Sequence, residues 1–199
     1  MYSTDTVWSG RPGGVEPGAH TFCVGPKVSL QGADLRETRL DDLDLQGADL
    51  RGVDLRGVSC VRTNFDGAAL AGAQLQGADL RGARLGATDL READLQGADL
   101  RWTWLSGACL VRANLHGAVM SRCYGKGTDF SRADLQGVDL SGAELRWPDL
   151  READLRGANM VCMLELATLD GARCDEQTRW PEWLTPATLQ SALLGNATL

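Results

Sequence analysis

Aspartate and arginine recur through this sequence at a spacing of five residues, and they are the commonest side chains that could do chemistry. One repeat reads Ala-Asp-Leu-Arg-Gly and contains Asp79 and Arg81. Aspartates that alternate with arginines in this way predict surface ion pairs and not a general acid–base pair. The two histidines, His20 and His116, are far apart in the sequence and belong to no recognisable nucleophile or metal-ligand motif. The sequence therefore predicts a protein that is not an enzyme and has neither a cofactor nor a metal.

The cysteines do not form a disulfide or metal-binding framework. None of them are arranged as C-x-x-C, and Cys60, Cys123, Cys162 and Cys174 occupy positions that the repeat turns inward. We expect them to pack as small apolar side chains in the reduced state. A cytoplasmic location fits reduced cysteines best. The six cysteines are Cys23, Cys60, Cys109, Cys123, Cys162 and Cys174.

The five-residue period defines the structural element that must position these side chains. With the exception of Gly125, every fifth residue from 30 to 160 has an apolar side chain, usually that of Leu, and the residue two places before it is usually Ala. On an α-helix such leucines would spread around the whole circumference, and on a continuous strand they would alternate between faces. A unit made of a short β-bridge, with a small, a polar and a large residue, followed by a turn explains the five-residue period. Ala and Leu then point inward, Asp points outward, and Gly occupies the turn.

Four such bridges and four corners close a square coil of 20 residues, and coils of this kind stack about 4.8 Å apart. The predicted fold is an all-β solenoid, a quadrilateral β-helix of about seven coils with a short C-terminal α-helix. We predict an N-terminal tail and cap at 1–27, the β-helix at 28–174 and a C-terminal helical segment at 175–199.

Repeats such as Ala48-Asp49-Leu50-Arg51-Gly52 resemble the A(D/N)LXX motif of the pentapeptide-repeat proteins. The resemblance covers about two-thirds of the chain and implies a right-handed quadrilateral β-helix. Some members of this family protect DNA gyrase and topoisomerase IV from quinolones or other poisons, and they do so by mimicking DNA. For this chain the resemblance implies the same class of partner as an expectation.

Both ends of a stacked coil need a cover, because the terminal backbone groups are otherwise unpaired. The residues near 184–195 read as a helix in which Thr185 is the N-cap, Pro186 is the first helical residue and Gly195 ends the helix. Its apolar side chains would cover the last coil or form a homodimer interface, as in some resistance proteins of the family. The residues concerned are Trp180, Trp183, Leu184, Leu189 and Leu193.

Three irregularities interrupt the repeat. Gly125, within 121–128, replaces the large inward residue and predicts a local bulge or a small cavity. Pro148 stands at an inward small site and predicts a local defect in the hydrogen-bond ladder. After Met160 the pattern shifts by one residue, so that Leu164 is the next large inward residue.

Outward side chains that are 20 residues apart lie on the same side of the square tube, and we call each of the four sides a wall. One wall, which we call the acidic face, carries six carboxylates against three arginines and therefore nets −3. We predict that its aspartates contact a partner. The residues are Asp34, Asp54, Asp94, Asp134 and Asp154.

A second wall carries aromatic residues, and we call it the aromatic face. Trp104 and Tyr124 are 20 residues apart, which places them on adjacent coils, and Trp102 and Trp147 lie at its corners. Exposed aromatic side chains this close together are typical of a contact surface. The alternative is that they cover the irregularity at 121–128.

The net charge of −7 argues against nonspecific nucleic-acid binding, and no apolar run is long enough to span a membrane. The leading hypothesis is a DNA-mimicking protein that binds DNA gyrase or topoisomerase IV and protects it from a poison, in resistance or self-immunity. The alternative is a structural scaffold or adaptor that binds another protein through the aromatic face. A homodimer through the C-terminal helix is compatible with both.

Overall fold

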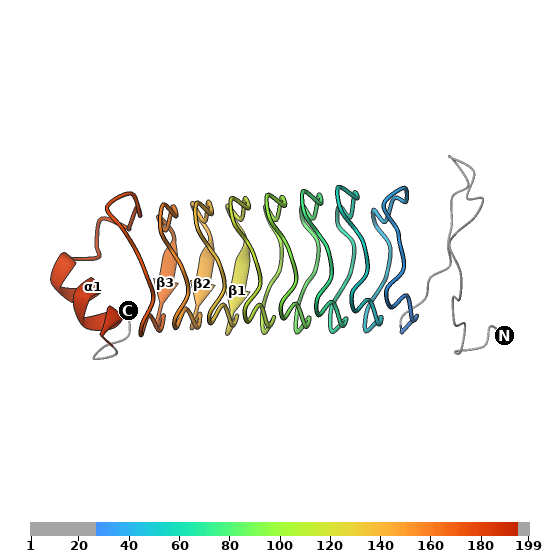
Figure 1. Cartoon of the computed structure of the whole chain (residues 1–199). Coiled ribbons are helices and arrows are strands. Elements are labelled where there is room, and N and C mark those ends of the chain that lie inside the picture. Colours follow the sequence, from blue (N-terminus) through green and yellow to red (C-terminus); the bar gives the residue numbers. More distant parts are fainter. Residues whose placement is uncertain (1–26, 195–199) are drawn as a thin grey trace.

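The computed structural model describes residues 27–194, and these form a rod of stacked coils (Figure 1). Parallel bridges join each outward residue to the one 20 places later, as in Asp34↔Asp54, Asp54↔Gln74 and Gln74↔Asp94. Bridges at 49, 54, 59 and 64 mark the four walls of one coil. The β-helix solenoid and its 20-residue period, both predicted from the spacing of leucine, are confirmed.

Backbone hydrogen bonds explain why small, polar and large residues alternate. The N–H of Leu75 donates to the carbonyl of Asp94 at 2.7 Å, and the N–H of Asp94 donates to the carbonyl of Ala73 at 2.9 Å. At the corner, Gly77 has a φ of 64°, a conformation that glycine adopts without steric cost. Other corners hold Arg62 or Trp102 at the same positive φ, so glycine is preferred there but not required.

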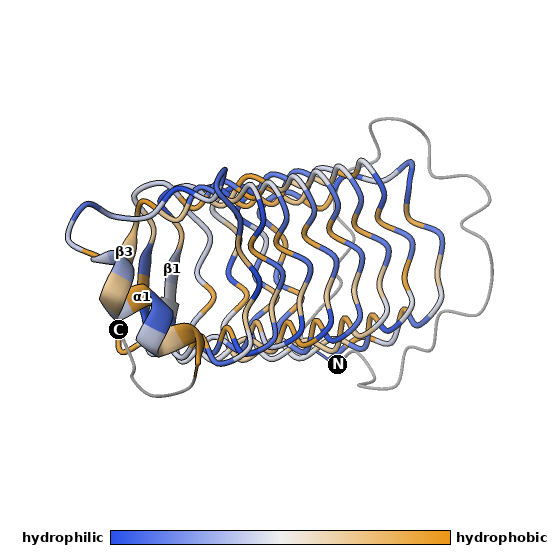
Figure 2. Ribbon diagram, turned by 60° about the vertical axis from the view of Figure 1, so that its left-hand side comes forward, coloured by the Kyte–Doolittle hydropathy of each residue, from blue (hydrophilic) through white to orange (hydrophobic). Residues whose placement is uncertain are grey.

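The core is the inside of the tube, and it consists almost entirely of the inward Leu and Ala positions. Leu35, Leu55 and Leu75 lie on successive coils and are 5%, 0% and 1% exposed. Figure 2 shows the resulting alternation of apolar and polar positions along each coil. Because each coil buries its side chains only against the coils on either side, stability depends on uninterrupted stacking.

Among the described residues 27–194, one wall has bridges that extend into strands. The strands are β1 (Tyr124–Lys126), β2 (Glu144–Arg146) and β3 (Met163–Glu165), which pair in parallel in the order β1-β2-β3. The offset between paired residues is 20 from β1 to β2 and 19 from β2 to β3, where Leu145 pairs with Leu164. The one-residue shift after Met160, predicted from the sequence, is confirmed.

The expectation of a bulge or cavity at Gly125 is wrong. Gly125 lies inside β1 in regular register with Leu145. A Cβ atom added to it would lie 2.5 Å from Oγ1 of Thr128 and 3.0 Å from Cδ2 of Leu145. These two side chains therefore fill the space that a leucine takes in other coils. The buried Thr128 hydroxyl is satisfied because it donates to the carbonyl of Leu105 at 3.0 Å.

The expected ladder defect at Pro148 is also wrong. On either side of it, Trp147 N–H donates to the carbonyl of Glu165 and Asp149 N–H donates to the carbonyl of Thr128. At the equivalent position of a regular coil the N–H bonds within its own turn, as Ala143 does to Leu140. Proline therefore removes a turn hydrogen bond and leaves the ladder between coils continuous.

The helix α1 (Pro186–Leu193) lies across the C-terminal end of the rod (Figure 1). As predicted, Thr185 is its N-cap, with a side chain that accepts a hydrogen bond from Thr188 N–H, and Pro186 begins the helix. The N–H of Gly171 donates to the carbonyl of Leu193 at 3.0 Å, which ties the last coil to the helix. Trp180, Leu189 and Leu193 pack against the core, and Leu184 is buried.

Two predicted features fall outside the described residues. They are the N-terminal cap, which includes His20 and Cys23, and the helix end at Gly195.

Candidate functional site: the acidic and aromatic faces

In the repeated Asp-Leu-Arg segment, the aspartate and the arginine of the same repeat bind each other. The carboxylate of Asp34 accepts hydrogen bonds from the backbone N–H of Arg36 at 3.2 Å and from its Nε and Nη2 at 2.9 and 2.6 Å. The aspartate thus stabilises the turn and holds the arginine of the same repeat in a bidentate pair. This gives the alternation of Asp and Arg a structural role within each coil.

The same unit recurs along three walls, so that much of the acidity is neutralised where it arises. Hydrogen bonds from Arg56 lower the pKa of Asp54 below its usual value, and those from Arg156 do the same for Asp154. The guanidiniums extend outward beyond the carboxylates, since Arg56 is far more exposed than Asp54. Further pairs of this kind are Asp49–Arg51, Asp79–Arg81, Asp89–Arg91, Asp99–Arg101 and Asp149–Arg151.

The five aspartates predicted as contact residues differ in their exposure and in their hydrogen-bond partners. Asp34 and Asp54 are paired as described, whereas Asp154 is only 4% exposed and bonded to Arg156 at 2.6 Å and Arg173 at 2.8 Å. The expectation that Asp154 presents its carboxylate outward is therefore wrong, because the one-residue shift places Arg173 over it.

The remaining two aspartates of the acidic face bond to amides. Asp94 accepts from Nε2 of Gln76 at 2.6 Å and from Nδ2 of Asn114 at 3.0 Å. Asp134 accepts from Gln136, through both its backbone N–H and its side chain. Both carboxylates are half-buried. Neither carboxylate has a bidentate guanidinium partner.

The aspartate–arginine units make a testable contribution to stability. Hydrogen bonds from arginine lower the pKa of Asp49, Asp79 and Asp89 in the folded state. A lowered folded pKa stabilises the protein above the unfolded pKa of about 3.9, and this contribution is lost as the pH falls through the folded pKa. Urea midpoints should therefore be similar at pH 7 and pH 5 and fall below about pH 4.

A matched variant checks the origin of this acid sensitivity. Arg81→Gln removes the charged partner of Asp79 and leaves the coil otherwise unchanged, so its stability at neutral pH should decrease while its decline below about pH 4 becomes shallower. An identical pH profile in the wild-type protein and the variant would show that this pair contributes nothing to it.

The aromatic face is flat, exposed and built on β1–β3. The rings of Trp104 and Tyr124 stack with centroids 4.9 Å apart, and Trp104 is 55% exposed. Trp102 and Trp147 lie at its corners and are 44% and 49% exposed. Because Thr128 and Leu145 fill the space at Gly125, these aromatic rings are not needed to cover a cavity there.

Apolar exposure continues from the aromatic face toward α1, which the sequence reading missed. Met163 follows Glu144 in the register of β3, and Leu166 occupies the corner after Trp147. Together with Trp183 they line an open depression of about 620 Å³, and all three are exposed. The one-residue shift after Met160, carried through to Met163 and Leu166, would have placed both side chains on this wall.

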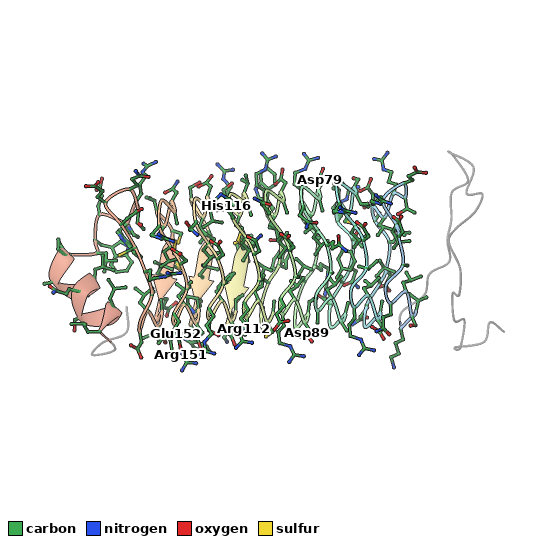
Figure 3. The ribbon with its side chains drawn as sticks, viewed as in Figure 1. Asp79, Asp89, Arg112, His116, Arg151 and Glu152 are labelled. Atoms are coloured by element: carbon green, nitrogen blue, oxygen red, sulfur yellow. The ribbon has the colours of Figure 1, made fainter. Side chains whose placement is uncertain are left out.

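The groups that could support catalysis are dispersed or inert. Figure 3 shows His116 on the opposite side of the rod from Arg112 and Arg151. Burial raises the pKa of the Cys123 and Cys162 thiols to about 12, which makes them poor nucleophiles. Across residues 27–194, no three His, Cys, Asp or Glu side chains are grouped to hold a metal ion. No helix in the same part of the chain is long and apolar enough to cross a membrane.

Comparisons with known proteins agree with this architecture. The family model for pentapeptide repeats matches the chain in overlapping stretches that together run from 27 to 162. A pentapeptide-repeat protein from the Arabidopsis thaliana thylakoid lumen is 35% identical, over 51% of this chain and 70% of its own, with a TM-score of 0.50. No curated protein sequence matched the chain.

Two further solved structures are more distant. HetL, a pentapeptide-repeat protein involved in heterocyst differentiation regulation in the cyanobacterium Nostoc, is 29% identical over 79% of this chain and 82% of its own, with a TM-score of 0.43. QnrB1, a plasmid-mediated fluoroquinolone resistance protein, is 20% identical over 85% of this chain and 94% of its own, with a TM-score of 0.34. By its repeat, its coils and the extent of the match, the chain belongs to the pentapeptide-repeat family and has that family's right-handed β-helix fold.

Proposed function

We propose that this chain is a non-catalytic binding protein that docks another protein through the aromatic face. The supporting observation is the stacked pair of Trp104 and Tyr124 beside two further exposed tryptophans, on the wall that contains β1–β3. Rigid aromatic rings lose little conformational entropy on binding, and tryptophan and tyrosine supply much of the binding energy at protein interfaces. The β-helix holds these rings in place before a partner arrives.

The geometry favours this scaffold function over DNA mimicry. A duplex carries about one negative charge per 1.7 Å of its axis. On the acidic face, Asp34, Asp54 and Asp154 are instead paired with arginines, whose guanidiniums extend beyond the carboxylates. A basic DNA-binding surface would meet guanidiniums along much of this wall.

Protection of DNA gyrase or topoisomerase IV is the second candidate. The observation in its favour is that the carboxylates of Asp94 and Asp134 bond to amides and form no ion pair with an arginine. Contact with a basic enzyme surface would use these two aspartates, with no nucleic acid bound directly. The two candidates thus place the partner on different walls of the same rod.

Paired variants separate the two walls. Trp104→Ala with Trp147→Ala removes two of the four rings of the aromatic face. Asp94→Asn with Asp134→Asn removes the two carboxylates of the acidic face that bond to amides, and each pair is the control for the other. In capture from a host cell extract, followed by titration of the recovered partner, the tryptophan variant should bind at least about tenfold more weakly. The aspartate variant should bind as the wild-type protein does. Equal retention by the tryptophan variant would contradict the proposal.

Supercoiling by purified DNA gyrase, with and without a quinolone, tests the second candidate. Inhibition of the enzyme or rescue from the drug, lost in the Asp94→Asn and Asp134→Asn variant alone, would establish the topoisomerase function in place of the scaffold. If neither is seen with the wild-type protein, the DNA-mimic function fails. Circular dichroism of both variants confirms that the fold is retained.

A further inference from the structure

Two cations beside the aromatic face lack the carboxylate partner that most arginines of this protein have. Within residues 27–194, Arg122 and Lys126 form no ion pair with an aspartate or glutamate, although both are exposed. In the same range, two other basic side chains form no ion pair with a carboxylate. They are Lys27 and Arg179, which lie toward the two ends of the solenoid. Arg62, three coils earlier at the equivalent corner, is held by Asp42 at 2.7 Å.

Arg122 and Lys126 flank Tyr124 on a single coil. The residues between them, Cys123 and Gly125, are buried, so the three outward side chains form a row of cation, aromatic ring and cation. Arg122 lies at the corner before β1, with a φ of 59°, whereas Tyr124 and Lys126 are alternate residues of β1 and therefore about 6.5 Å apart. A second extended chain that lies along β1 presents alternate side chains at the same spacing, so one of its residues can meet Tyr124 and the next residue on the same face can meet Lys126. On the other side of Tyr124, the same chain passes the exposed side chain of Arg122 at the corner.

The surrounding charges leave this row positive. Arg84 pairs with Asp66, and Arg146 pairs with Glu165 at 3.3 Å, so these neighbours compensate one another. Glu144, beside Tyr124 in the register of β2, is the carboxylate on this wall next to the row, and it forms no ion pair. Two uncompensated cations against one carboxylate give a local charge of +1 on a protein whose net charge is −7. Lys126 is also held in place, since its Nζ lies 4.5 Å from the centroid of the Trp147 ring.

From this row we infer the chemistry of the partner: an extended acidic segment in which an apolar side chain is flanked, two residues away on each side, by carboxylates. The apolar side chain lies against Trp104 and Tyr124, and the two carboxylates meet Arg122 and Lys126. The inference rests on the proposed docking function and specifies its partner. Single-stranded nucleic acid also combines stacking with negative charge, but it needs a basic groove along several nucleotides, and this wall offers only two uncompensated cations.

The test uses three capped peptides of defined sequence, each titrated into the full chain while the tryptophan fluorescence is recorded. The first contains Glu-Ser-Phe-Ser-Glu, the second contains Gln-Ser-Phe-Ser-Gln, and the third has the composition of the first in the order Glu-Glu-Ser-Ser-Phe. The first should bind about tenfold more tightly than either of the others, and the preference should shrink as salt is added. Arg122→Gln with Lys126→Gln should abolish the preference, and Glu144→Gln should increase it.

Arg62→Gln is the matched control, because it removes an arginine from the same corner column but three coils away from Arg122, and it should leave the preference unchanged. Equal binding of the three peptides, no binding of any, or a preference that survives Arg122→Gln with Lys126→Gln would overturn the inference. So would tighter binding of an oligothymidylate than of the first peptide. Failure of the docking function is measured separately. It would be seen as unchanged binding of the captured partner by the variant with Trp104→Ala and Trp147→Ala.

Discussion

Gly125→Leu is expected to destabilise the protein by about 1–3 kcal/mol, although leucine is the residue that the repeat favours at this position. A Cβ at residue 125 would already lie 2.5 Å from Oγ1 of Thr128 and 3.0 Å from Cδ2 of Leu145. The remaining atoms of a leucine would have to displace both side chains inside a packed tube. Urea denaturation, monitored by circular dichroism, measures the change in the free energy of unfolding.

Met120→Leu is the matched control for this substitution. It also introduces the favoured leucine at an inward site, but at nearly constant volume, and should change stability by less than about 1.5 kcal/mol. Combining Gly125→Leu with Thr128→Ala should recover part of the loss, because the nearest obstructing atom is then absent. If Gly125→Leu instead stabilises the protein, the site holds a cavity and the packing described here is incorrect.

Leu95→Ala should cost about 2–5 kcal/mol, and Leu95→Asp should abolish cooperative folding altogether. Leu95 is completely buried at the middle of the tube. A cavity there removes contacts with the coils on either side, and an aspartate would place an unpaired carboxylate in a wholly apolar core. Because repeats interact only with their neighbours, the damage should begin locally.

The adjacent Asp94→Ala is the control, because residues 94 and 95 point to opposite sides of the same wall. It loses hydrogen bonds from Gln76 and Asn114 at a half-buried site and should cost only about 1 kcal/mol. Hydrogen exchange of the Leu95→Ala protein should show reduced protection first at Leu75 and Leu115, on the neighbouring coils. A uniform loss of protection along the rod would indicate that the coils do not behave as a one-dimensional stack.

The sequence predicts those parts of the structure that depend on periodicity. Leu35, Leu55 and Leu75 lie on successive coils because five residues make one bridge and one corner, and the sequence shows this spacing directly. The shift from Leu145 to Leu164 is visible for the same reason, and Thr185 with Pro186 marks the helix start through local chemistry. Trp104 and Tyr124 are adjacent because they are one coil apart.

Features that depend on side-chain contacts between neighbouring coils could not be predicted from the five-residue period. Thr128 fills the space at Gly125, and Arg173 closes over Asp154 after a one-residue shift. Whether Pro148 interrupts the ladder depends on which carbonyl would accept a hydrogen bond from the N–H that proline lacks. The exposed cations Arg122 and Lys126 stand out only when every other ion pair is known. In each case the deciding contact joins different coils, and a five-residue pattern does not specify it.

Pairwise distances between spin labels on one wall test the stacking on which every face assignment depends. With Cys23, Cys109 and Cys174 replaced by serine, one label at Arg36→Cys is combined in turn with His116→Cys, Gln136→Cys or Arg156→Cys. These positions lie four, five and six coils from the first, since bridges repeat every 20 residues. Double electron–electron resonance should give distances that increase by about 4.8 Å at each step. Distances that fail to rise in equal steps would contradict the stacked coils and, with them, both the acidic and the aromatic faces.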